Sequence, residues 1–313
     1  MLPSTRSLLA SLVAAAACAS ILLVDVAHAD EATPAERKGD YALPFAMRPA
    51  LAANLVRLDD ALALTDASKT KGATTHASLL TAGYRPVEAV PDLGLYARVA
   101  LVHFSNDAGV AATALSNPLV FGLFTPELAP HLRLALFLGA TAPIGAGGGD
   151  APASSTVSAV QSGVYARQAM DNALFASNFL SVCTGAGLAW IDRGFTAQAE
   201  LGVFELVRAR GAGVEADASR TNFTGALGVG YRIVPLLTAS VELHYQRWLS
   251  TPMAVEKDAT KRAQATYGLG LRANLPLSRT TIARPGLGYF RGIDDPMATA
   301  RYQIVQLDLP IAF

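Results

Sequence analysis

The sequence predicts an all-β fold, a closed antiparallel transmembrane β-barrel of about twelve strands with one long external loop that is partly helical. Three observations support this prediction. Apolar residues recur at every second position in most of the chain, the chain beyond its N-terminus is apolar without a good membrane-spanning helix, and short and long connections alternate. Successive strand residues point to opposite faces, so the alternation gives each strand one apolar and one polar face.

Composition places the chain outside the ordinary soluble class. Hydrophobic residues make up 51% of it, and the mean hydropathy is +0.32. The longest uncharged apolar stretch after the N-terminus, 108–126, is interrupted by Pro118 and Gly122, so it does not predict a spanning helix. A closed barrel is the remaining membrane solution, because in lipid every backbone polar group must be paired internally. The formal net charge is +0 with scattered basic residues, which argues against a nucleic-acid partner.

The N-terminus has the pattern of a secretory signal peptide over residues 1–29. Arg6 supplies the positive region, residues 8–24 are apolar, and a small-x-small cleavage site ends at Ala29. We therefore expect export through the periplasm and a mature barrel of residues 30–313 in the outer membrane of a Gram-negative bacterium.

An uncleaved anchor or a lipoprotein signal at Cys18 is the alternative interpretation of this segment. Three alanines rather than a branched residue precede Cys18, and apolar chain continues past it, so cleavage after Ala29 is favoured. Cleavage leaves Cys183 as the one cysteine, so no intramolecular disulfide is expected.

The chain ends on a strongly two-faced segment, with polar Gln306 and Asp308 between apolar residues. This pattern resembles the last strand of Gram-negative outer-membrane β-barrel proteins, whose C-terminal Phe is read by the barrel-assembly machinery. We expect this strand to pair with the first strand and close the barrel. The residues of this C-terminal assembly signature are Val305, Leu307, Leu309, Ile311 and Phe313.

Alternation predicts the other strands with differing clarity. The first lies between residues 47 and 64 without a defined register. In 195–208 the alternation slips between Gly202 and Glu205, which predicts a glycine-associated bulge. The remaining predicted strands are 76–84, 93–101, 119–123, 132–138, 180–191, 222–233, 237–246, 262–275 and 281–290.

Connection lengths predict the orientation, because outer-membrane barrels have short periplasmic turns and longer external loops. Short turns such as 192–194 alternate with long polar connections such as 249–261. Residues 145–178 form the longest connection, on the external side. Within it, 164–175 has lost the period of two and predicts a helix, either a plug in the lumen or an external lid.

Charged and polar residues on the inward face are the candidate functional residues. One interpretation is a lumen of mutually paired charges that hold a narrow barrel together. The other is a pore whose basic excess favours anionic or polar solutes. Inward glycines at 228, 230, 268 and 270 leave space in one sector, for a channel or for a docked loop helix. The pore-lining candidates are Arg98, Arg133, Glu200, Arg232, Glu242, His244, Arg262, Arg272 and Asp308.

Catalytic motifs are not found in the sequence. The histidines are separate, and neither Gly-x-Ser-x-Gly nor His-Glu-x-x-His occurs. His76 and Ser78 match the His-x-Ser order of outer-membrane phospholipases only loosely. We therefore expect no enzyme, no metal and no cofactor.

A short motif adds a family resemblance. Asn117, Pro118 and Gly122 form Asn-Pro-x-x-x-Gly, followed by the apolar strand 132–139. This hairpin resembles the Asn-Pro-led strand of proteobacterial transporter-like barrels grouped with phenol-degradation meta-pathway proteins. The resemblance implies passage of small hydrophobic or aromatic compounds and supplies no catalytic residue, while the loop 145–178 departs from the simplest form of the group.

The function predicted from the sequence is an outer-membrane channel for diffusion of small molecules, either polar or anionic or small aromatic. The alternative is a structural or adhesive surface barrel with a sealed lumen, and an outer-membrane enzyme is third. The expected partners are outer-membrane lipid and lipopolysaccharide, the barrel-assembly machinery and a small-molecule solute, with no nucleic acid.

Overall fold

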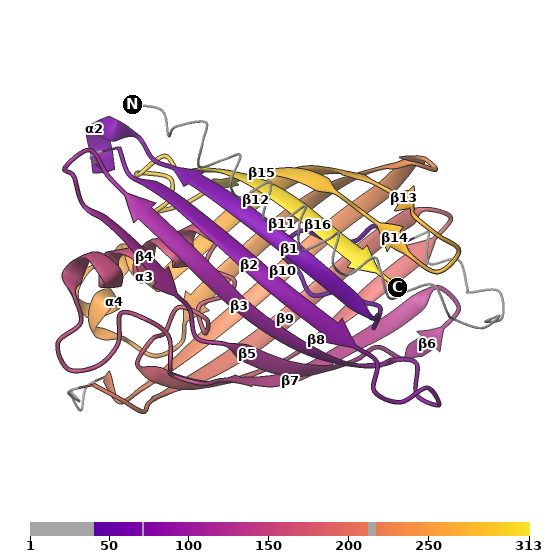
Figure 1. Ribbon diagram of the computed structural model, residues 1–313, viewed down its shortest axis with the longest axis horizontal. Helices are drawn as coiled ribbons and strands as arrows, with labels where there is room; N and C mark the ends of the chain where they lie inside the picture. Colours follow the sequence, from indigo (N-terminus) through magenta and orange to yellow (C-terminus); the bar gives the residue numbers. More distant parts are fainter. Residues whose placement is uncertain (1–40, 71, 212–216) are drawn as a thin grey trace. The chain divides into compact units, whose positions relative to one another are not determined.

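The computed structural model describes residues 41–70, 72–211 and 217–313; the predicted signal peptide, 1–29, lies outside this range. Within it, twelve antiparallel strands pair in sequence order, and β1 also pairs with β16, so the sheet closes on itself (Figure 1). The fold class predicted from the sequence is confirmed. The wall strands are β1 (Leu55–Leu64), β2 (Thr74–Tyr84), β3 (Leu93–Ser105), β5 (Leu119–Phe124), β7 (Leu132–Thr141), β8 (Phe179–Asp192), β9 (Phe195–Arg208), β10 (Ser219–Val234), β11 (Leu237–Trp248), β12 (Ala263–Ala273), β15 (Gly286–Gly292) and β16 (Gln303–Ala312).

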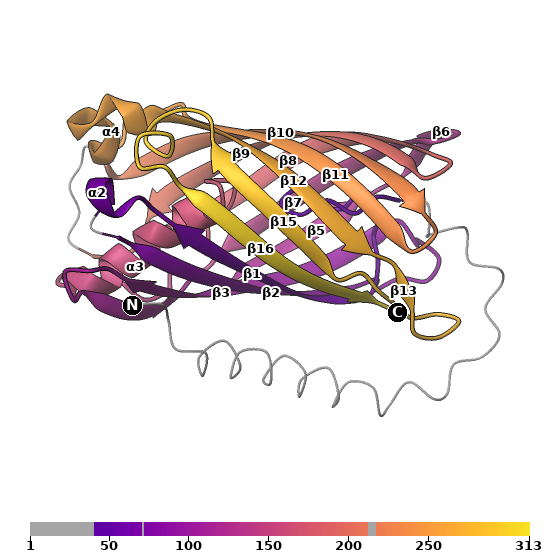
Figure 2. The same ribbon diagram turned by 90° about the horizontal axis from the view of Figure 1, so that it is seen from above.

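The two ends of the barrel differ in their connections. At the short-turn end, strands are joined by turns such as 193–194 and 235–236. At the opposite, long-loop end lie the helices α2, α3 and α4, whereas β6 and β13 lie at the short-turn end (Figure 2). The additional elements are α2 (Ala67–Thr70), β4 (Ala111–Leu115), β6 (Glu127–Ala129), α3 (Ser154–Ala166), α4 (Met253–Lys257), the 3₁₀ turn η3 (Ala259–Arg262), β13 (Leu275–Pro276) and β14 (Ile282–Ala283).

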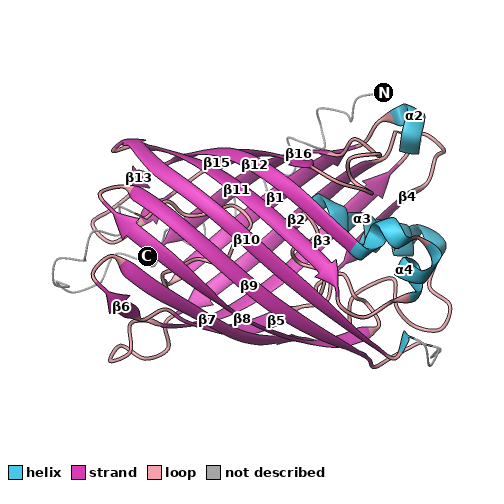
Figure 3. Ribbon diagram, turned by 180° about the vertical axis from the view of Figure 1, so that it is seen from behind, coloured by secondary structure: helices cyan, strands magenta, loops and turns pink. Residues whose placement is uncertain are grey.

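The outer surface of the barrel is apolar. The strands cross it at a common tilt (Figure 3). Val241, Leu269 and Leu307 are each about half exposed, whereas the strand residues between such positions are mostly buried on the inner face. Sheets of this type meet lipid with one face and enclose the other. Among the described residues, no helix has the length and apolar character needed to cross a membrane.

Closure of the barrel depends on the C-terminal strand. β16 pairs with β1 in an unbroken register from Leu55 opposite Ala312 to Leu64 opposite Gln303. The apolar residues of the predicted signature point outward, while Gln306 and Asp308 are buried inside. The backbone N–H of Phe313 also donates to the Asn54 carbonyl oxygen at 3.1 Å. The predicted pairing of last and first strands is therefore confirmed.

Two strand predictions need correction, for one physical reason. β9 pairs regularly with both neighbours, without the bulge predicted near Gly202, and Phe204 and Leu206 point inward. In β5 the alternating residues Leu119, Phe121 and Leu123 are likewise buried on the inner face. Both sets belong to the main buried apolar cluster, which includes residues of the long β7–β8 connection. The inner face is apolar where the β7–β8 connection packs against it. At these positions, residue polarity alone predicts that the inward residues face outward.

The long connection contains a helix at a different place from the one predicted. α3 covers Ser154–Ala166, whereas the prediction was 164–175. Residues 167–175 instead form turns, with left-handed backbone at Gln168 and Ala169. The loss of the two-residue period was a correct sign that this segment is not a strand.

Candidate functional site

The inside of the barrel is filled by two segments that the wall strands bind. The first insert is residues 41–54, which precede β1; the second insert is residues 167–175 of the β7–β8 connection. Both carry buried residues that contact side chains from opposite sides of the wall. The lumen they occupy is the candidate functional site.

Two wall carboxylates hold the first insert. Glu242 on β11 accepts hydrogen bonds from the backbone N–H groups of Phe45 at 2.5 Å and Ala46 at 3.1 Å. Glu200 on β9 accepts from the backbone N–H of Arg48 at 3.0 Å and pairs with its guanidinium at 2.5 Å. Hydrogen bonds to a carboxylate are roughly twice as strong as neutral ones, so these two side chains are specific anchors.

Wall arginines bind the carbonyl groups of the same insert. Arg57 and Arg272 share Asp308, at 2.8 and 2.6 Å, and each also donates to the insert, Arg57 to Pro44 O at 3.2 Å and Arg272 to Leu43 O at 3.2 Å. Carboxylates bind these N–H groups and arginines bind these carbonyls, so these backbone groups of the first insert have hydrogen-bond partners inside the lumen.

The glycine-lined sector of the wall receives the first insert. A Cβ atom at Gly270 would lie 2.2 Å from the Phe45 ring, and one at Gly230 would lie 2.3 Å from Ala42. A side chain at either position would have to push the insert away from the wall, so the glycines make room for Phe45 and Ala42. The sequence indicated space in this sector. The first insert occupies this sector, and not the 164–175 segment that the sequence offered as a candidate.

The second insert is held by two buried ion pairs. Arg167 contacts Asp59 on β1 at 2.8 Å, and Asp171 accepts from Arg98 on β3 at 2.9 Å. Asn172 extends the contacts to β10, donating to Asn222 at 3.1 Å. Residues 167–175 are therefore a plug in the lumen, one of the two positions that the sequence left open.

Asn117 fixes both ends of the long connection that carries the second insert. Its side-chain oxygen accepts from the Gly145 N–H at 2.9 Å, and its side-chain NH₂ donates to Ala176 O at 2.8 Å. Its own backbone N–H donates to Leu174 O at 2.8 Å. The Asn-Pro motif singled out in the sequence thus clamps the loop, and Pro118 begins the extended chain that leads into β5.

The two inserts meet inside the barrel. Met47 from the first and Met170 from the second share a buried apolar cluster with Ala226 of β10. A gap of about 10 Å³ remains between the first insert and β9–β11. A water molecule needs a cavity of about this size or more, so that part of the lumen is closed.

The mouth at the long-loop end is covered by α3. Tyr165 at the end of α3 lies 5.4 Å, ring centre to ring centre, from Tyr302 in the β15–β16 connection. Burial raises the pKa of both phenols above the ordinary value, so both stay neutral at physiological pH.

Eight of the nine predicted pore-lining residues lie on the wall strands, in three groups. Glu200, Glu242, His244, Arg272 and Asp308 are buried inside, and Arg98 faces the second insert. His244 lies 3.0 Å from Glu242 and 3.3 Å from Thr266. Arg133 and Arg232 lie toward the short-turn end. Arg133 pairs there with Asp92 and Glu127, and the Arg232 N–H donates to Gly194 O.

Arg262 is the exception among these candidates. It ends the η3 turn in the β11–β12 connection and bonds Ser250 O and Thr251 Oγ1, so it belongs to a loop and not to the wall. The sequence placed it at the first position of a strand that in fact begins at Ala263.

Sequence reasoning missed the residues of the inserts and their partners. Arg48, Asp59, Arg167 and Asp171 all make buried ion pairs but were not among the candidates. One signal was available in the sequence. Residues 41–54 contain two prolines and no alternation, so an apolar segment that cannot be a central strand had to be covered in another way.

His76 and Ser78 lie on the outward face of β2, where Ser78 Oγ donates to Asp60 at 2.6 Å. Among the described residues, no group of three or more His, Cys, Asp or Glu side chains is arranged to hold a metal ion.

The closed twelve-strand wall, apolar outside and lined with charge inside, defines the chain as a barrel of the Gram-negative outer-membrane class. No family model and no curated protein matches it. Among solved structures it is similar to the COG4313 outer membrane channel from Pseudomonas putida F1, at 15% identity and a TM-score of 0.52, over 90% of this chain and 100% of that one. The KdgM porin gives 10% identity and a TM-score of 0.47, over 82% of this chain and 99% of that one.

These identities establish the shared fold alone. The recognition of an outer-membrane barrel from the sequence is confirmed. The narrower resemblance to barrels grouped with phenol-degradation proteins stays a prediction, because no family model matches the chain.

Proposed function

We propose that the protein is an outer-membrane channel for small molecules that rests in a closed state and opens when one or both inserts leave the lumen. In this proposal the long-loop end faces outward and the short-turn end faces the periplasm, as in other barrels of the class. The COG4313 protein from Pseudomonas putida F1, whose structure gives the TM-score of 0.52, is itself an outer membrane channel, which agrees with the proposal.

The observation that carries the proposal is the polar character of the contacts between wall and inserts. Arg48 with Glu200 and Arg167 with Asp59 are buried ion pairs in a lumen that could have been filled with apolar side chains. Buried ion pairs add little net stability compared with a well-packed apolar core. Charged side chains on the inner wall therefore fit a lumen that is filled with water when the inserts are displaced. Release of an insert then requires breaking only a few polar contacts, so it can be reversible.

The solute is proposed only by class. With both inserts displaced, the wall would present Arg57, Arg98 and Arg272 together with Asp59, Glu200, Glu242 and Asp308. Both signs of charge line the path, so small polar solutes fit it, and the anionic or small aromatic solutes named from the sequence remain candidates.

The rival function is a structural or adhesive barrel with a permanently sealed lumen. The two inserts inside the barrel, with a gap of only about 10 Å³ between the first insert and β9–β11, favour this rival. The two functions differ in whether the inserts ever leave, and conductance across a planar bilayer reports this directly.

A reversible lock separates the two functions. Ala42 and Gly230 are close enough for a disulfide after a small movement, since a Cβ at Gly230 would lie 2.3 Å from Ala42 and disulfides need about 3.5–4.5 Å between Cβ atoms. We expect Ala42→Cys with Gly230→Cys to open less often when oxidised than when reduced, because the disulfide keeps the first insert in the lumen. A second variant that lacks residues 150–175 should conduct more than the full chain. Silence of the reduced lock, of this deletion and of the unmodified protein would support the sealed barrel and overturn the channel.

A further inference from the structure

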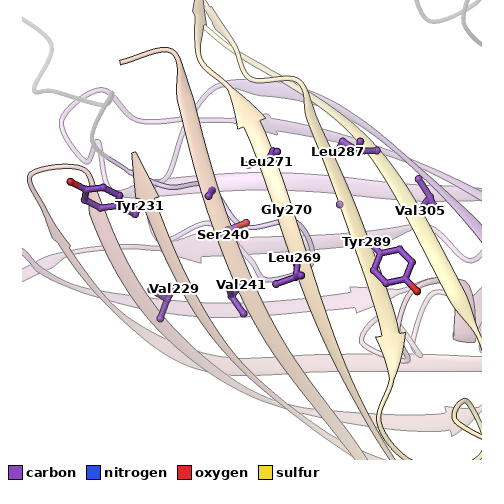
Figure 4. Close-up of a pocket in the computed structure, with 12 residues that line it drawn as sticks. Val229, Tyr231, Ser240, Val241, Leu269, Gly270, Leu271, Leu287, Tyr289 and Val305 are labelled. Carbon is purple, nitrogen blue, oxygen red and sulfur yellow. The ribbon is translucent and has the colours of Figure 1, made fainter. Parts of the chain in front are cut away.

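The outer surface of the barrel carries an apolar groove that the proposed channel does not use. The groove has a volume of about 580 Å³ and crosses five neighbouring strands, β10, β11, β12, β15 and β16 (Figure 4). Ala239 lies between Tyr231 and Leu271 in the strand register, so a small side chain stands in a row of large ones and lowers the surface there. The groove also meets Val241, Leu269, Leu287, Tyr289 and Val305.

Two outward arginines stand on the same strands, toward the long-loop end. Arg291 follows Tyr289 by two residues on β15 and lies opposite Tyr267. Arg247 follows Val241 by six residues on β11, on the same face. Both are exposed, and neither makes an ion pair with any residue in the described ranges. An arginine on the lipid-facing side of a barrel is costly near the midplane and cheap only at the interface.

The lipid surface next to these arginines is aromatic. Tyr245 lies two residues before Arg247 and contacts Phe223 of β10, with ring centres 6.5 Å apart. Tyr267 and Tyr289 flank Arg291 across and along the strands. Aromatic side chains of this kind mark the level of the membrane–water interface on barrels. The arginines are thus placed at headgroup depth and the groove at acyl-chain depth.

We propose that the groove and the two arginines form a docking site for an acylated, phosphate-bearing lipid of the lipopolysaccharide class. One acyl chain lies in the groove and a phosphate binds Arg291, with Arg247 as a second contact. Two residues of strand span about 7 Å, so a headgroup at Arg291 brings its acyl chain directly to the groove at Tyr289. The guanidinium fork matches phosphate oxygens in geometry and charge.

The site rests on the proposed orientation, in which the long-loop end faces the outer leaflet, but not on an open lumen. Charge selects the occupant: a neutral lipid would fill the groove and leave both arginines unpaired, whereas a phosphate pairs them. Lipid retention and ion conductance are measured separately, so one proposal can fail without the other.

The experiment measures binding of lipid A to the full-length protein in detergent micelles by native mass spectrometry, with folding checked by circular dichroism. We expect Arg247→Gln combined with Arg291→Gln to weaken binding at least tenfold, and Ala239→Leu, which fills the groove, to weaken it severalfold. Matched controls are Arg193→Gln at the short-turn end and Ala186→Leu on the outward face of β8, and both should bind like the unmodified protein.

Dephosphorylated lipid A separates the two parts of the site. It should bind the unmodified protein more weakly than lipid A does, and it should bind the arginine variant as well as the unmodified protein. Ala239→Leu should still weaken its binding. Equal binding of lipid A by the arginine variant and the unmodified protein would overturn the phosphate contact. No effect of Ala239→Leu on either lipid would overturn the acyl groove, and the docking site with it.

Discussion

Arg167 in the long β7–β8 connection places its guanidinium 2.8 Å from the carboxylate of Asp59 on β1, and the two side chains are only 1% and 2% exposed. β1 is the strand that pairs with the C-terminal strand to close the barrel. The ion pair therefore joins the second insert to the closing seam of the wall. Separating the pair would leave a buried charge without its partner, which is strongly unfavourable. This penalty holds the second insert in place.

Replacing Arg167 should weaken this attachment. We expect Arg167→Ala to lower the free energy of unfolding by about 3–5 kcal/mol, because Asp59 is left buried without its closest partner. Planar-bilayer recordings should show more frequent openings than for the unmodified protein. Arg193→Ala is the control, since Arg193 is 94% exposed in a turn at the other end of the barrel. Identical recordings from Arg167→Ala and the control would show that the second insert does not limit conduction.

The first insert can be tested at its backbone. In Glu242→Gln one of the two carboxylate oxygens becomes an NH₂ group, so it can no longer accept from both Phe45 N–H and Ala46 N–H. Hydrogen exchange at these two amides should become at least tenfold faster, with amides in the middle of β9 unchanged as an internal control. Unchanged exchange at residues 45 and 46 would mean that packing of Phe45, and not the carboxylate, retains the insert.

A charge exchange tests whether Arg48 and Glu200 act as a pair. Arg48→Glu alone puts two carboxylates together and should raise conductance and lower the midpoint of thermal unfolding. Adding Glu200→Arg restores opposite charges and should reverse part of both changes. Recovery will be incomplete, because Arg48 also stacks on the Phe137 ring, 3.7 Å from its centre. A double variant no better than the single one would contradict the pairing as the source of retention.

The wall could be predicted from the sequence because lipid imposes a strict rule on one face. β11 and β16 show this best, since every second residue from Leu237 to Tyr245 and from Val305 to Ile311 is apolar and the residues between them face inward. The interior obeys no such rule. Leu119 and Phe204 point inward because the long connection lies against them, and no local pattern reports a contact with chain so distant in sequence.

The inserts could not be predicted for the same reason. Glu200 and Glu242 were identified as inward charges, but their partners are backbone N–H groups about 150–200 residues earlier in the chain. A backbone donor has no sequence signature. The first strand was predicted only within residues 47–64, although the prolines in residues 41–54 are a signal against a central strand there. The glycines of β10 and β12 indicated space, yet joining the two observations required the fold.

Acid should loosen the β9–β10 connection only at low pH. Burial raises the pKa of Asp217, but hydrogen bonding and the charge of Arg220, with Arg208 nearby, outweigh this and hold the pKa below the ordinary 3.8. A carboxyl with a lowered folded-state pKa stabilises above its ordinary pKa and loses that contribution as pH falls through the folded value. Hydrogen exchange near Asp217 should thus be unchanged from pH 7 to 5, after correction for intrinsic rates, and faster below pH 4. Asp217→Asn should reproduce the acid behaviour at pH 7; loosening already at pH 5 would point to another group.

Asp60 is a carboxylate on the lipid-facing side of β1, because its neighbour Asp59 is buried inside and contacts Arg167. Ser78 on β2 donates to it at 2.6 Å, while Leu307 on β16, opposite in register, is 49% exposed. A charged group facing lipid lowers barrel stability, and one neutral hydroxyl compensates only in part. We therefore expect Asp60→Leu to raise the free energy of unfolding in lipid vesicles by about 1 kcal/mol, and Ser78→Ala to lower it by about the same amount. The measurement is urea-dependent folding into vesicles, and in Asp60→Leu the further change Ser78→Ala should have a smaller effect than in the unmodified chain. A loss of stability in Asp60→Leu would show that this carboxylate is paired in the membrane with something beyond Ser78.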